Sequence, residues 1–175
     1  MSIAFAQHWK LFQDKAVEVM SQGGGEQQVQ KLLDSLTQLL FGLDESIKQK
    51  ATNALDLIIQ LVNSLSSKSE PIAISALKAI KSCVIRNSVG RQQCRAAGVF
   101  PFLNTTLNEY QEHALIVEEA MTTLAALSMS NDLNALQVRR SLCHVCDDTH
   151  SNSNLACFTG YHAISHAREH GSNNV

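Results

Sequence analysis

Residues 71 to 85, PIAISALKAIKSCVI, have the apolar spacing of a helix, and their pattern recurs on both sides along the chain. Shifted by 44 residues, it falls on residues 27 to 40 upstream and within residues 109 to 128 downstream. Two alignment columns are apolar in all three copies: Leu32, Ala76 and Ala120, and Leu36, Ile80 and Leu124. A helical unit that recurs at a fixed period buries its apolar face only by packing against its neighbours. The repeat therefore predicts a row of helices that presents a surface.

The remaining apolar segments also predict helices. Residues 3 to 20 carry apolar side chains every three or four positions, and Trp9 is the expected anchor of this N-terminal cap. Pro71 suits the first turn of the central helix, whose N–H groups have no intrahelical partner, and Ser69 is its expected cap. Further helical segments are expected at residues 47–65, 91–97 and 100–107. With only two prolines and eight glycines, the sequence predicts an all-α protein.

Residues 90 to 103, GRQQCRAAGVFPFL, resemble the first two helices of an armadillo repeat. Gly98 permits a sharp change of direction between two short helices, and Pro101 fits the first turn of the second. Residues 118 to 127, EEAMTTLAAL, follow at the distance of the family's long third helix. The resemblance covers residues 26 to 137. It implies a right-handed α-solenoid of about three armadillo-like repeats, with a HEAT-like arrangement of the flanking units as an alternative.

The repeat divides the chain into three regions. Residues 1 to 22 form the expected N-terminal capping helix, and residues 26 to 137 the armadillo-like repeats, in which Ala54 occupies the glycine column of the preceding unit. The register is lost after Arg140, so residues 138 to 175 are predicted to be an irregular tail, loosely packed or disordered. One alternative is a truncated form of a longer armadillo protein. Self-association through the uncovered last repeat would then be expected.

The resemblance implies partner binding along the third helices. In peptide-binding members of the family these helices present ladders of asparagine and tryptophan, but neither ladder is present here, so recognition of a basic nuclear localisation peptide does not carry over. The face is instead predicted to bind a protein or peptide as a non-catalytic scaffold. Its candidate residues are Asp34, Gln38, Lys78, Lys81, Ser82, Arg86, Thr122 and Ala126.

The C-terminal segment offers a second interpretation. Cys143 and Cys146 have the CxxC spacing of half a zinc site, and Cys157 with His162 supplies a candidate second half. A zinc-binding adaptor that uses these four residues is therefore the alternative function. Without that metal, no cofactor is expected.

Several other classes of function are disfavoured. The net charge of −2 provides no basic field for nucleic acid, and no long apolar run predicts membrane insertion. Without a secretory signal, a cytoplasmic location is expected, with the nucleus as the alternative. No phosphate loop, GxSxG or HExxH motif occurs, so no enzymatic activity is predicted. Cys83 and Cys94 are interpreted as core thiols, and His113 with Glu112 as a surface pair.

Overall fold

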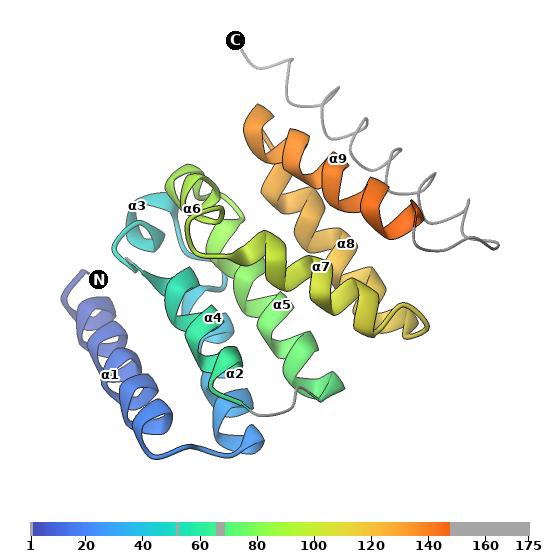
Figure 1. Ribbon diagram of the computed structural model, residues 1–175. Helices are drawn as coiled ribbons and strands as arrows, with labels where there is room; N and C mark the ends of the chain where they lie inside the picture. Colours follow the sequence, from blue (N-terminus) through green and yellow to red (C-terminus); the bar gives the residue numbers. More distant parts are fainter. Residues whose placement is uncertain (1, 52, 66–68, 148–175) are drawn as a thin grey trace, which may run out of the picture.

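The computed structural model describes residues 2–51, 53–65 and 69–147, with side chains from residue 5 to residue 140 over the same ranges (Figure 1). Within these ranges all regular structure is helical, as predicted. The helices are α1 (Ser2–Ser21), α2 (Glu26–Leu40), α3 (Glu45–Lys48), α4 (Ala54–Asn63), α5 (Glu70–Val84), α6 (Ser88–Gln93), α7 (Val99–Glu109), α8 (Ala114–Ser128) and α9 (Asp132–Asp147).

Three of these helices repeat at the interval found in the sequence. α2, α5 and α8 each contain 15 residues and begin at Glu26, Glu70 and Ala114, 44 residues apart. α5 lies between the other two and packs against both (Figure 1). It is consequently buried on two sides, with Ala76, Leu77 and Ile80 fully enclosed. The apolar columns of the sequence are therefore the contact surfaces between these helices.

Each of the three helices ends in the same turn. The first residue after the helix is extended and the second has a positive φ, which is the geometry of a type II turn. The positive φ angles are 69° at Gly42, 51° at Arg86 and 51° at Ser130, again 44 residues apart. A left-handed conformation costs a residue other than glycine about 1–2 kcal/mol. The positive φ thus recurs every 44 residues even at Arg86 and Ser130, where glycine, the residue that best tolerates it, is absent.

The predicted helix over residues 47–65 is wrong, because the structure breaks it into α3 and α4. Asn53, directly before α4, has a φ of 64°, which ends one helical direction and starts another. Asparagine tolerates this conformation better than most residues. Gly98, with a φ of 78°, has the same role before α7. At an offset of 44 residues the sequence aligns Gly98 with Ala54. In the structure the residue with the left-handed conformation is instead Asn53, one position earlier.

The N-terminal helix agrees with the sequence. α1 packs against α2 and α4, and Trp9 and Phe12 are buried on that side. Their rings are stacked, with centroids 5.4 Å apart. The aromatic face of α1 thus covers the outer side of the first repeated helix.

At the other end, α9 runs to Asp147, past the boundary expected at residue 137. Val138 is fully buried, and α9 packs against α7 and α8. Residues 138 to 147 therefore continue a helix rather than begin an irregular tail, because α9 has an apolar surface to pack on. The rest of the predicted tail lies outside the described residues.

Candidate interaction face and its polar contacts

The predicted partner-binding residues lie on α2, α5 and α8 and on the turn after α5, but they differ in exposure. Gln38, Lys78 and Arg86 are exposed, whereas Asp34 and Ser82 are half-buried. Ala126 is buried and contributes nothing to the surface. Only some of the predicted partner-binding residues are therefore accessible to a partner.

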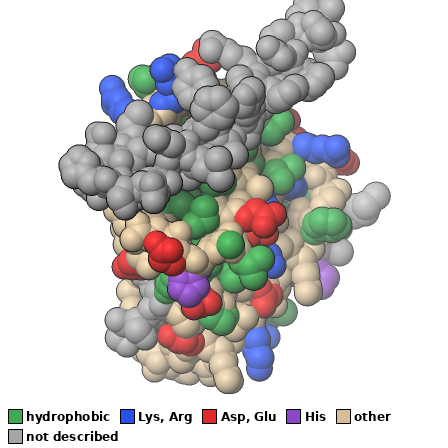
Figure 2. All heavy atoms as spheres, turned by 90° about the vertical axis from the view of Figure 1, so that its right-hand side faces the viewer, with side chains coloured by type: hydrophobic (Ala, Val, Ile, Leu, Met, Phe, Trp, Pro, Cys, Tyr) green, Lys and Arg blue, Asp and Glu red, His purple; other side chains and the backbone are tan. Residues whose placement is uncertain are grey.

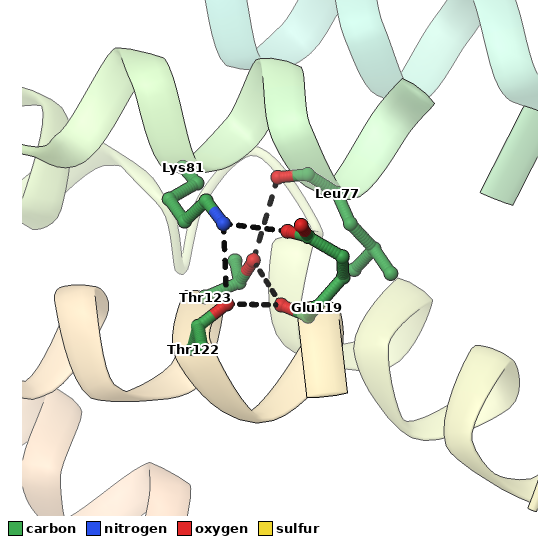
Figure 3. A network of polar contacts seen from close by, with 5 residues as sticks. All are labelled: Leu77, Lys81, Glu119, Thr122 and Thr123. Atoms are coloured by element: carbon green, nitrogen blue, oxygen red, sulfur yellow. Dashed lines mark hydrogen bonds and ion pairs between the residues drawn. The ribbon is translucent and has the colours of Figure 1, made fainter. Parts of the chain in front are cut away.

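Lys81 and the exposed Thr122 take part in polar contacts between α5 and α8 (Figure 3). Lys81 Nζ lies 2.5 Å from Glu119 Oε2 and donates to Thr122 Oγ1 at 3.2 Å. Thr123 Oγ1 contacts the Glu119 carbonyl at 2.7 Å and the Leu77 carbonyl at 3.4 Å. These contacts join α5 to α8. The charge of Lys81 is thus already balanced by Glu119, which the sequence did not indicate.

We expect this ion pair to have a measurable coupling energy. The side chains of Lys81 and Glu119 are only 25% and 24% exposed, so water screens the pair less than it screens a surface pair. A double-mutant cycle with Lys81→Met and Glu119→Gln, measured by urea unfolding, should give about 1 kcal/mol of coupling. The exposed Lys10–Asp14 pair, 3.6 Å apart, is the control and should give close to zero. Equal coupling in the two cycles would contradict this interpretation.

Lys48 is a structural cation that the sequence did not reveal. Its side chain is 5% exposed, and Nζ donates to the Ser82 carbonyl at 3.0 Å and to the Ile85 carbonyl at 2.8 Å. Burial is the main cause that lowers the pKa of Lys48, and the charge of Arg86 lowers it further. The last carbonyls of a helix have no intrahelical donor, so the ammonium group satisfies them. Lys48 thereby ties α3 to the end of α5.

Two asparagines 44 residues apart, Asn87 and Asn131, cap the N-terminal ends of α6 and α9. Asn87 Oδ1 accepts from Gly90 N at 3.1 Å, and Asn131 Oδ1 accepts from Asn134 N at 3.0 Å. Asn87 Nδ2 also donates to the Cys83 carbonyl at 2.8 Å. Because Asn87 caps it, α6 begins at Ser88, three residues before the start expected at Arg91. The turn and its asparagine cap thus occur together after α5 and after α8, whereas Leu43 occupies the equivalent position after α2.

The two thiols in the described side chains are buried, as predicted. Burial raises the pKa of Cys83 to about 12 and that of Cys94 to about 11. Cys94 Sγ donates to the Arg91 carbonyl at 2.9 Å. Both thiols are therefore expected to remain protonated near neutral pH.

His113 pairs with a different carboxylate from the one expected. Its Nδ1 lies 3.1 Å from Glu70 Oε1, and both side chains are about half exposed. Glu70 begins α5 and His113 precedes α8, so the pair connects neighbouring repeated helices at their N-terminal ends. The expectation that Glu112 is the partner is wrong because α5 lies closer than the sequence suggests.

The predicted metal ligands cannot be assembled from the described residues. Cys143 and Cys146 lie in α9, where only the backbone is described, and Cys157 and His162 lie outside the described residues. Elsewhere in the described part of the chain, no group of three or more His, Cys, Asp or Glu side chains is arranged to hold a metal ion.

One face of the molecule is of mixed character. Figure 2 shows the side that lies on the right in Figure 1, where hydrophobic side chains lie among acidic ones. Leu115 of α8 is 70% exposed.

Among the described helices, none has both the length and the apolar character needed to cross a bilayer. No protein-family model matches this sequence, and no curated protein shows significant similarity to it.

Proposed function

We propose that this protein is a non-catalytic protein-interaction scaffold built on a right-handed, armadillo-like α-solenoid. The observation that carries the proposal is the repeated unit itself, in which α2, α5 and α8 have the same length, the same 44-residue interval and the same type of terminal turn. Helices packed in a row present long surfaces rather than a deep enclosed site. Such a surface suits a protein or peptide partner.

The exposed face of α5 is the proposed contact region. Lys78 and Arg86 are exposed there, while Lys81 is engaged by Glu119 and Lys48 by carbonyl groups. Within the described residues, Lys78 of α5 and Arg86 of the following turn therefore supply the exposed positive charge of this region. We propose that a partner meets this face with complementary polar or acidic groups.

Charge reversal at Lys78 tests the proposal. Partners are captured on the complete 175-residue chain, and the affinity of each purified partner is then measured by calorimetry. Lys78→Glu is expected to weaken binding about tenfold, because a favourable charge contact becomes repulsive. Lys15→Glu is the matched control, since Lys15 is an exposed lysine on α1. Equal affinities of the two variants would place the contact region elsewhere.

A further inference from the structure

Three large apolar side chains are exposed at equivalent points of the repeat. Phe41, Ile85 and Met129 each follow the end of α2, α5 or α8, and they are 81%, 40% and 50% exposed. They are 44 residues apart and occupy the first central position of the three type II turns. We call these three residues the turn ridge. Since α5 packs against both α2 and α8, the ridge follows one edge of the row of helices (Figure 1).

Each of the three turns is closed by the same backbone hydrogen bond. The amide two residues after each ridge residue donates to the carbonyl one residue before it. These N–O distances are 3.4 Å for Leu43 to Leu40, 3.2 Å for Asn87 to Val84 and 3.3 Å for Asn131 to Ser128. The backbone therefore fixes the points at which the exposed side chains leave the chain. A partner that covers the turns costs little backbone freedom, and the loss is confined to the rotamers of the side chains.

The middle of the ridge is positively charged. Arg86 follows Ile85 directly, is exposed, and is not paired with a carboxylate within the described residues. The ammonium group of Lys48 donates to the carbonyl of Ile85, the residue before Arg86, and its pKa is lowered mainly by burial and further by the charge of Arg86. The nearby carboxylate of Glu45 is already bound by the amide and the hydroxyl of Ser88, at 2.7 and 2.5 Å. Arg86 is thus available to an acidic group of a partner.

The spacing of the ridge suits an extended chain. Packed helices lie about 8–10 Å apart, and a peptide in the polyproline II conformation advances about 3.1 Å per residue and turns every third side chain to the same side. One repeat therefore corresponds to about three peptide residues. We propose that the turn ridge docks a peptide segment of a partner in the polyproline II conformation, which carries an apolar side chain at about every third position and a carboxylate opposite Arg86. This inference rests on the proposed scaffold function and names the partner class and the edge that binds it.

Peptide selection tests the ridge directly. Phage that display random dodecamer peptides are selected on the complete chain, and enriched peptides are synthesised with a fluorescent label. We expect enriched sequences to share apolar residues three positions apart with an acidic residue between them. Binding is then measured by fluorescence anisotropy for the wild type, the ridge variant Phe41→Ser/Ile85→Ser/Met129→Ser and a control variant.

The control removes exposed apolar side chains at three positions elsewhere. Leu11→Ser/Val17→Ser/Leu115→Ser changes three side chains that are exposed but lie outside the turns. The ridge variant is expected to bind about tenfold or more weakly, and the control within about twofold of the wild type. Circular dichroism verifies that both variants are folded. If unfolding affects the triple variant, Phe41→Ser alone, at the most exposed position, should still weaken binding about threefold.

The variant Arg86→Gly tests whether the charge of Arg86 contributes to peptide binding while the turn is kept. Glycine is favoured at a φ of 51°, so this variant should melt about 3 °C higher than the wild type. It should nevertheless bind the acidic peptide about threefold more weakly, and the difference should shrink in high salt. Unchanged peptide affinity in this variant would remove the acidic requirement and overturn the proposed partner class.

Other results also decide the matter. Equal losses in the ridge and control variants, or failure to enrich any peptide, overturn the ridge. If the selected peptides bind Lys78→Glu more weakly but bind the ridge variant as well as the wild type, the turn ridge is not the binding site, and the scaffold proposal stands. A doubled mass in light scattering that the ridge variant abolishes would assign the edge to a second copy of the chain instead.

Discussion

Replacing Ile80 by alanine is expected to lower the free energy of unfolding by about 3 kcal/mol. Ile80 is completely buried in α5, the helix that packs against both α2 and α8. Removing its side chain leaves a cavity at the centre of the row, where neither neighbour can close in without losing its other contacts. Urea unfolding followed by circular dichroism measures the change.

The matched control for this variant is Ile85→Ala. The same side chain is truncated only five residues away, but Ile85 lies on the turn ridge and is 40% exposed. The expected loss is below about 1 kcal/mol, because little contact is removed. Similar losses for the two variants would mean that α5 is not enclosed by its neighbours, and the row of helices would lose its main support.

Replacing Gly90 by alanine has the second largest expected effect, and its sign is opposite to helix propensity. Inside a helix, alanine is more stable than glycine by about 1 kcal/mol. At Gly90 an added Cβ would lie 2.7 Å from Asn87 Nδ2 and 2.9 Å from the Cys83 carbonyl oxygen. Those two atoms are hydrogen-bonded to each other, so the methyl group must displace the cap of α6. We expect a loss of about 2–3 kcal/mol.

Gly25→Ala serves as the control for Gly90→Ala. An added Cβ at Gly25 meets nothing within 4 Å, and its φ of −72° is accessible to alanine. Its loss should stay below about 1 kcal/mol, as for a weak N-cap change. Thermal unfolding of both variants gives the comparison. Stabilisation by Gly90→Ala would show that propensity outweighs the contact with Asn87.

Much of the helical pattern could be predicted from the sequence. The 44-residue interval placed α2, α5 and α8, and the aromatic spacing placed α1, because contacts between successive helices impose periodic apolar positions. The interruption between α3 and α4 was missed because the apolar pattern continues across Asn53, whose conformation is set by packing rather than by a glycine.

The candidate site was less predictable. Lys81 resembled a free surface lysine, yet it meets Glu119, 38 positions further along the chain. Lys48 lies in the polar stretch 44–50 and resembles a surface lysine, yet its two carbonyl partners belong to the end of α5. Such pairings depend on how neighbouring helices are placed, and no local pattern records that placement. Ala126 was similarly assigned to the surface although the structure buries it.

The sequence by itself determined the helical class and the 44-residue interval of this protein, because burial at each helix contact requires an apolar residue at a fixed place in the chain. Only the tertiary structure decided which polar and apolar side chains remain exposed. Lys81 is paired with Glu119, whereas Arg86 is exposed to solvent. Phe41 is likewise exposed, although its neighbour Leu40 is buried. Exposure depends on the packing of distant helices and on the direction of each turn, which arise only when the chain is folded.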